Sequence, residues 1–363
     1  MDTDAPESLH LGNFTYFSFF SELHHSDHVT TTTLETLAIT VVFLVSVAAN
    51  ATAAVLVTWE RRLLANKTVL TLNLFVADLL FVSMIPLIVA VRWTVTWTLG
   101  HTACHTVLYV ICMSGCVAIT TLASISVERV QAILRLQTVP TLNPRMVTTT
   151  LFFIWSFSAL TSLPLSLFFT VIEVDFPKQV WMILIVESRT VKTHFFLSIV
   201  ILSPQKRVHI CTLKWPDAAG EIVWNVAFTA LCFIVPGLII VVSYSKILQI
   251  AKRCRLRLRP SNTQLPVREP PNYHVSRQDM KLFRTMLVLV FSFVIMWSPI
   301  FIITFLILAR NFLGHLYVSS TMFFWVVTFT MANSALNPIL YSVFQFKNSW
   351  RKICCGAVVV PLK

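Results

Sequence analysis

Charged residues are scarce in this sequence. Asp, Glu, Lys and Arg make up 12% of the 363 residues and hydrophobic residues 56%, whereas a water-soluble protein carries about 25% charged residues. This shortage excludes an ordinary water-soluble surface and indicates that much of the chain faces lipid. A secretory signal peptide is also missing, because the first residues are acidic rather than basic. We therefore expect the first apolar helix to act as its own insertion signal.

Motifs of enzymes and transporters are missing too. The sequence has no Gly-rich phosphate loop, no nucleophile elbow and no cluster of metal ligands. Its eight cysteines do not follow metal-ligand spacing. We therefore expect no enzyme and no metal centre. Internal repeats, which are typical of transporters, are not apparent, so a membrane transporter stays only as an alternative.

Seven apolar segments are each long enough to cross a hydrocarbon core of about 30 Å as a helix. They are residues 34–57, 68–91, 103–134, 146–169, 222–250, 281–308 and 317–341. The sequence thus predicts an all-α membrane protein, a bundle of seven transmembrane helices. Proline inside a span removes a backbone hydrogen bond and bends the helix. Such prolines occur in five spans, as Pro86, Pro164, Pro236, Pro299 and Pro338.

The basic residues set the orientation. Most Lys and Arg residues lie in loops on one side of the predicted bundle and after the last span, while residues 1–33 contain neither Lys nor Arg. By the positive-inside rule the N-terminus is extracellular, and we expect a plasma-membrane protein. Residues 1–33 then form an extracellular tail, 170–221 a long second extracellular loop, 251–280 the third intracellular loop, and 342–363 a cytoplasmic amphipathic helix with a short tail. The net charge of +12 faces anionic membrane lipid and does not indicate nucleic-acid binding.

Polar residues inside the predicted spans are costly to place in lipid and are usually functional. Asp78 and Asn50 lie midway along the second and first spans, and Asn333, Asn337 and Tyr341 recur every four residues on one face of the seventh. One interpretation is hydrogen bonding that only holds helices together. We favour the other, a buried network of acid, amides and water that rearranges when the helices move.

Glu128 and Arg129 end the third span on the cytoplasmic side. Arg129 either extends to the membrane interface or forms a local ion pair that breaks when a partner inserts between the helices.

These residues belong to a pattern with one match in each span. It consists of Asn50, Leu74 with Asp78, Cys104, Glu128 with Arg129, Trp155, Pro236 with Tyr244, Trp297 with Pro299, and Asn337 and Pro338 with Tyr341. In this order the sequence resembles the rhodopsin-like G-protein-coupled receptors.

The resemblance implies roles for these residues. Arg129 would meet the C-terminal helix of a G protein, Trp297 would be the toggle beneath the ligand, and Pro299 would let the sixth helix swing. The remaining activation residues would be Glu128, Tyr244, Asn337, Pro338 and Tyr341, and a sodium ion or water would lie among Asn50, Asp78, Asn333 and Asn337. Val130 departs from the usual Tyr after Arg129, so coupling strength or basal activity is expected to differ.

Several cysteines and one asparagine are candidates for covalent modification. Cys104 and Cys211 both face the oxidising side; the resemblance implies that they form a disulfide, and two free thiols are the alternative. Asn13 begins an extracellular glycosylation sequon. Cys354 and Cys355 follow the last span closely and are palmitoylation candidates.

Two missing residue types exclude two classes of ligand. The outer half of the third span has no acid for an amine ligand, and the seventh span has no Lys for a retinal Schiff base. What remains is Arg92, at the outer end of the second span, above aromatic and aliphatic residues. A guanidinium binds a carboxylate through paired donors, so a carboxylate with a long apolar tail fits. The alternative is that Arg92 reaches lipid phosphates beside Trp93 and Trp97.

Several stretches resemble the long-chain free fatty acid receptors more closely, namely residues 72–81, 90–97, 210–216, 243–250 and 323–337. The resemblance implies that Arg92 binds the carboxylate of a long-chain unsaturated fatty acid. Around the ligand it places Phe81, Trp97, Cys112, Trp224, Phe228, Trp297, Ile300, Phe323 and Phe324. It also implies a Gq-type G protein, with a Gi-type as a further option, and downstream effects on hormone secretion and inflammation. Another lipid or a peptide is the alternative ligand.

The sequence departs from that family in four places. Leu108 and Cys112 replace a more aromatic and hydroxylated pair, and Cys232 stands where the family has an amide. No Ser- and Thr-rich tail follows Cys355, which leaves arrestin binding an open question. Residues 178–208 have no counterpart, and they are either a genuine insertion folded over the pocket or a translated intron.

Overall fold

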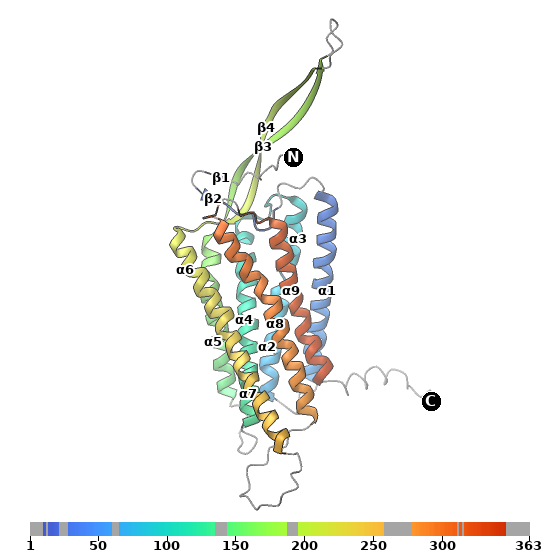
Figure 1. Ribbon diagram of the computed structural model, residues 1–363, viewed down its shortest axis with the longest axis vertical. Helices are drawn as coiled ribbons and strands as arrows, with labels where there is room; N and C mark the ends of the chain where they lie inside the picture. The colour runs from blue at the N-terminus through green and yellow to red at the C-terminus, as the bar shows by residue number, and fades with distance from the viewer. Residues whose placement is uncertain are drawn as a thin grey trace, which may run out of the picture.

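The fold is a bundle of membrane-length helices with a long β-hairpin at one end (Figure 1). The computed structural model describes residues 10–11, 14–21, 28–59, 65–134, 144–186, 195–257, 277–310, 312–313 and 316–345. The helices are α1 (His28–Trp59), α2 (Ala65–Val82), α3 (Ile85–Thr94), α4 (Gly100–Leu134), α5 (Pro144–Phe168), α6 (Ala218–Thr229), the π-helix η1 (Ala230–Ile234), α7 (Val235–Arg257), α8 (Arg277–Arg310) and α9 (Ser320–Gln345).

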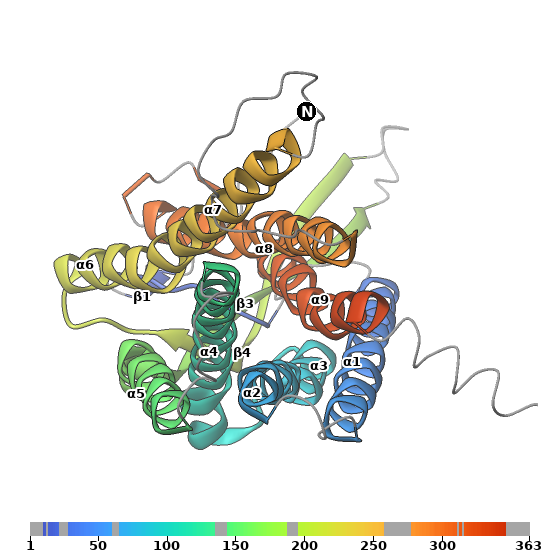
Figure 2. The same ribbon diagram turned by 90° about the horizontal axis from the view of Figure 1, so that it is seen from below.

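These helices make the seven predicted crossings. Six stretches of the described chain are long and apolar enough to span a membrane, and α9, which carries the polar face, completes the bundle. The second crossing is α2 followed by α3, and the fifth is α6, η1 and α7 in continuation. Seen along the bundle, α4 contacts α2, α5 and α7 (Figure 2). The prediction of an all-α seven-helix membrane bundle is confirmed.

Two of the five prolines lie where the backbone of a crossing is interrupted. Pro86 lies in the first turn of α3, directly after the break between α2 and α3, and Pro236 follows η1. Pro lacks an N–H, so the preceding turn loses one backbone hydrogen bond. Pro164, Pro299 and Pro338 lie inside α5, α8 and α9.

Most helices extend beyond the predicted spans. Helix α1 begins at His28 rather than at residue 34, and α7 and α8 reduce the predicted loop 251–280 to residues 258–276 at most. Hydropathy marks only the apolar middle of a helix, while its backbone hydrogen bonds continue into polar sequence. The predicted amphipathic helix after residue 345, Asn13, Cys354 and Cys355 lie outside the described residues.

The predicted second loop is a hairpin. Strands β3 (Phe169–Val186) and β4 (Phe195–Leu213) are antiparallel, with Val171 opposite Cys211 and Val186 opposite Phe195. The insertion lengthens the hairpin away from the bundle instead of folding over it (Figure 1). Its two short apolar runs pair with each other in register, which satisfies their backbone groups without a membrane. A second, minimal pair joins β1 (His10–Leu11) to β2 (Phe14–Thr15).

Candidate ligand-binding site

A cavity of about 360 Å³ lies inside the end of the bundle that carries the hairpin, which we call the hairpin end. Its walls come from α2, α4, α5, α6, α8 and α9, and from the base of the hairpin. Of the predicted ligand residues, those that line it are Phe81, Cys112, Trp224, Phe228, Trp297, Ile300 and Phe323. Arg92, Trp97 and Phe324 are not among the lining residues.

Aromatic contacts shape this cavity. Trp224 stacks on Phe228 with ring centroids 4.9 Å apart, and Phe81 lies 5.4 Å from Trp297. Trp297 also lies directly against Gly115 of α4, where an added Cβ would be 2.8 Å from its ring. Glycine is therefore required there for Trp297 to occupy this position.

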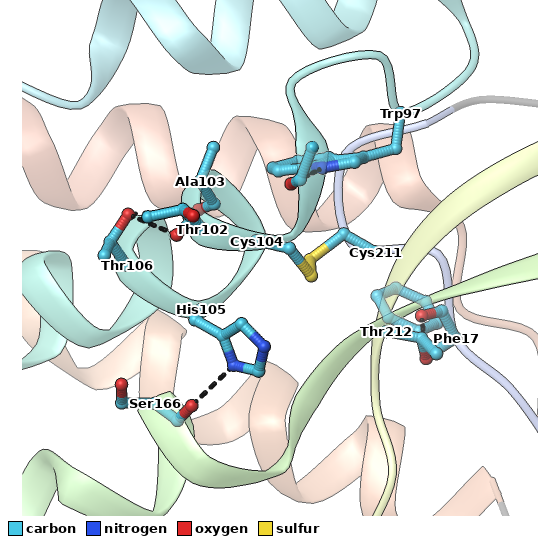
Figure 3. Close-up of a disulfide and its surroundings, with 11 residues drawn as sticks. Phe17, Trp97, Thr102, Ala103, Cys104, His105, Thr106, Ser166, Cys211 and Thr212 are labelled. Carbon is cyan, nitrogen blue, oxygen red and sulfur yellow. Dashed lines mark hydrogen bonds between the residues drawn. A yellow bond between two sulfur atoms is a disulfide. The ribbon is translucent and has the colours of Figure 1, made fainter.

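A disulfide ties the hairpin to the bundle. Cys104 of α4 and Cys211 of β4 are bonded, with their Cα atoms 5.7 Å apart (Figure 3). Trp97 is buried beside them; its backbone N–H donates to the His209 carbonyl at 2.7 Å and its indole N–H to the Gly100 carbonyl at 2.8 Å. Trp97 thus supports the loop around the disulfide rather than the cavity wall.

The segment of residues 16–21, expected only as part of a tail, is buried at the hairpin end. Phe17 and Phe19 line the cavity, and both pack edge-on against Phe323 at 6.0 and 5.1 Å. The hydroxyl of Thr212 donates to the Phe17 carbonyl at 2.9 Å. The aromatic run of residues 14–20 was the available sequence signal, because exposed tails seldom contain so many rings.

Arg92 is paired with a carboxylate of the protein itself. Its Nε donates to Oε2 of Glu35 at 2.8 Å and its Nη2 to Oε1 at 2.7 Å. Nη1 donates to the Phe20 carbonyl at 3.1 Å and Nη2 also to the Thr321 hydroxyl at 3.2 Å. The ring of Phe324 lies 5.2 Å from the guanidinium. Both charged side chains are almost completely buried.

Glu35 was missed in the sequence, although an acid at the edge of an apolar span signals a buried partner. With Arg92 engaged elsewhere, Lys214 is the basic side chain among the described residues that line the cavity. It is exposed, and Asp217 and Glu221 line the same cavity.

The predicted polar network lies deeper in the bundle. The amide of Asn337 donates to Asp78 at 2.9 Å, and the amide of Asn50 donates to the Ser334 carbonyl at 2.9 Å. Asn50, Asp78, Asn333 and Asn337 are all buried. Side chains from α1, α2 and α9 are thereby linked away from the ligand cavity.

The predicted coupling residues lie toward the opposite end. Glu128 is buried and Arg129 partly buried near the end of α4, and Tyr244 of α7 is buried in the main core. Tyr341 belongs to α9, but its side chain lies outside the described part of the chain.

Comparison with known proteins gives the class first. A family model described as 7 transmembrane receptor (rhodopsin family) matches residues 49–341, so the chain belongs to the rhodopsin family of G-protein-coupled receptors and is not an enzyme. It is 45% identical over 344 residues to free fatty acid receptor 4 of Mus musculus, covering 94% of this chain and 87% of that protein. The same values hold for free fatty acid receptor 4 of Rattus norvegicus. Somatostatin receptor type 5 of Rattus norvegicus is 32% identical over 151 residues, covering 40% of this chain and 38% of that receptor.

Proposed function

We propose that this protein is a plasma-membrane receptor, with its N-terminus outside, for long-chain unsaturated fatty acids. Its Arg92 would bind the ligand carboxylate, and it would signal to a Gq-type G protein. The observation that carries the proposal is the aromatic cavity beneath the disulfide-tied hairpin, in a chain similar to free fatty acid receptor 4 over almost its full length.

The cavity suits an acyl chain. Its lining is dominated by aromatic and aliphatic side chains, such as Phe81, Ile111 and Phe228, and burial of each CH₂ group is favourable by about 0.8 kcal/mol.

For Arg92 to hold the ligand, the ligand carboxylate has to take the place of the Glu35 carboxylate. Both anions would use the same two N–H groups, so the exchange keeps the guanidinium paired. Removal of Glu35 without a substitute would leave a buried, uncompensated charge at a cost of about 3–5 kcal/mol. Binding of the fatty-acid carboxylate and release of Glu35 from Arg92 would therefore be coupled.

A charge swap separates the ligand role of Arg92 from a purely structural one. We expect Arg92→Ala to abolish the calcium response to linoleic acid. Arg92→Ala should keep its surface expression. The double variant Arg92→Glu with Glu35→Arg should also be expressed at the surface, because the ion pair is rebuilt, yet stay unresponsive, because the cation has moved to α1. Calcium responses and surface labelling of the same cells measure both.

Two outcomes would contradict the anchor role. A normal dose response in the swapped receptor would reduce the Arg92–Glu35 pair to a structural element. Loss of the response in Lys214→Gln, with a full response in Arg92→Ala, would assign the carboxylate to the base of the hairpin.

The G-protein class has its own test. We expect a Gq inhibitor to block the calcium response and pertussis toxin to leave it unchanged.

We also propose that Asp78 binds a sodium ion. The Oδ1 atom of Asn50 is buried without a hydrogen-bond partner among the described residues, and Asp78 accepts from Asn337 through one oxygen. Oxygen ligands of this kind suit a hard cation.

A further inference from the structure

The far part of the hairpin is a two-stranded ribbon that lies beyond the bundle. We call it the distal arm and define it as residues 179–186 of β3 and 195–202 of β4, which pair with each other throughout. Figure 1 shows that it leads away from the helices, so no helix of the described chain lies against it. A two-stranded hairpin is only marginally stable in water by itself and needs a further layer packed against it.

The sequence of the distal arm is hydrophobic and uncharged. All of its residues except Gln179 and Ser198 are hydrophobic, and neither strand segment contains a charged residue, Pro or Gly. Nearer the bundle, by contrast, the hairpin carries the exposed ion pair of Glu173 and Arg207. Continuous hydrophobic runs are typical of strands that are covered, and an uncharged strand pair is prone to associate. The composition of the arm therefore fits a ribbon with a partner.

The register of the two strands sorts these residues into two faces. Residues directly opposite each other lie on the same face, and successive residues of a strand alternate between the faces. The face that includes Gln179 also includes Ser198. The other, which we call the apolar face, is hydrophobic at every position. It consists of Val180, Met182, Leu184, Val186, Phe195, Leu197, Ile199 and Ile201.

The apolar face is large enough for a stable interface. Burial of one large hydrophobic side chain removes roughly 60–120 Å² of apolar surface from water. The residues of this face together would therefore bury roughly 500–900 Å² in each copy. A stable protein–protein interface buries about 800 Å² on each partner. Two such faces packed against each other, at the usual sheet spacing of about 10 Å, reach this size.

We propose that the distal arm pairs with the distal arm of a second copy of this chain, apolar face to apolar face. An uncharged hydrophobic surface is complementary to itself and has no charge by which to select a different partner. Copies in one membrane carry their arms on the same side and at the same height, so a two-fold axis along the bundle brings the two faces together. Around that axis, β3 of each copy lies over β4 of the other, and Leu184 lies over Leu197 of the second copy.

Cross-linking tests this arrangement in full-length receptors with two different tags, expressed in the same cells. Copies with Leu184→Cys carry one tag and copies with Leu197→Cys the other, and a short bis-maleimide is added to the membranes. We expect a covalent dimer that contains both tags. The matched pair on the opposite face, Ile183→Cys with Ser198→Cys, should stay at the background set by the unmodified chain. Equal cross-linking of the two pairs would overturn the proposal.

Substitutions test how much the apolar face contributes to the pairing. Met182→Asn with Leu184→Asn should weaken the association of solubilised receptors by at least about tenfold, because two hydrophobic side chains in each copy lose their burial. Ile183→Asn with Ile185→Asn, on the opposite face, should change it by less than about twofold. Co-purification of the two tags and the number of photobleaching steps per particle measure the association.

Replacement of residues 179–202 by a short turn should leave single receptors. Association that persists without the arm, equal effects of the two double variants, or single receptors for the unmodified chain would each overturn the proposal. An arm occupied by a different protein in an otherwise single receptor would overturn it as well. None of these outcomes depends on the ligand, so they are separate from the tests of the proposed function.

Discussion

Gly115 shows how a single missing side chain positions the aromatic floor of the cavity. A Cβ at this position would lie 2.8 Å from Cη2 of Trp297 and 3.0 Å from Cζ3, and a rigid indole in a packed core cannot yield by bending. Overpacking of this kind costs about 1–3 kcal/mol. We expect Gly115→Ala to lower the thermal stability of the solubilised receptor by this amount and to weaken its calcium response.

Gly237 provides the matched control, because a Cβ added there would lie at an ordinary 3.8 Å from its nearest neighbour, the ring of Phe293. Gly237→Ala should be neutral or stabilising by up to about 1 kcal/mol, through helix propensity. Trp297→Phe in the Gly115→Ala background should recover stability, since the smaller ring vacates the contact. Equal effects of the two Gly→Ala changes would contradict this account.

The sequence predicted some of the rings that line the cavity, but it missed Phe17 and Phe19 and the groups that pair with Arg92. Two predicted rings, Trp97 and Phe324, do not line the cavity. Phe81 and Trp224 were predicted from the resemblance to fatty acid receptors, and both line the cavity. The partner Glu35 depends on how α1 packs against α3, a contact between residues 57 apart in the chain. A single sequence contains no signal for that packing beyond the unusual acid itself.

At the scale of elements, the hairpin divides into a part that serves the site and a part that does not. The base of the hairpin is tied to the bundle through Cys211, whereas the far ends of β3 and β4 extend away from it (Figure 1). We expect a receptor in which residues 179–202 are replaced by a short turn to keep its surface expression and its potency for linoleic acid. Dose-response curves of calcium release measure this.

Cys211→Ser is the contrasting change, because it frees the hairpin base that covers the cavity. It should abolish the response, and a disulfide of this loop length stabilises by several kcal/mol. A shortened hairpin that abolishes signalling would show that the insertion itself takes part.

The sequence indicated this insertion and its two apolar runs. Their pairing with each other is a contact between residues that are distant in the chain, and periodicity alone does not determine such contacts.

At the scale of the whole molecule, we propose that the polar centre of the bundle connects the ligand cavity with the coupling end. Asn50, Asp78 and Asn337 connect α1, α2 and α9, and Asn73 of α2 accepts from the Trp155 indole and donates to Thr121 of α4, both at 2.8 Å. Helices held by such specific bonds shift between discrete arrangements rather than deform continuously. A change at the cavity can therefore be transmitted without any contact between ligand and G protein.

Asp78→Asn tests this transmission. The amide keeps a hydrogen bond to Asn337 but removes the charge that would bind sodium, so we expect fatty-acid binding to persist while G-protein activation falls and no longer depends on sodium. Nucleotide exchange in membranes, compared in sodium and choline chloride, measures the effect. Ser114→Ala is the control, because the Ser114 hydroxyl donates within α4, to the carbonyls of Val110 and Ile111, and it should leave the sodium dependence intact. If Asp78→Asn kept both its G-protein activation and its sodium dependence, the polar centre would serve only to hold the helices together. The signal would then have to pass along the Trp297 side of the bundle.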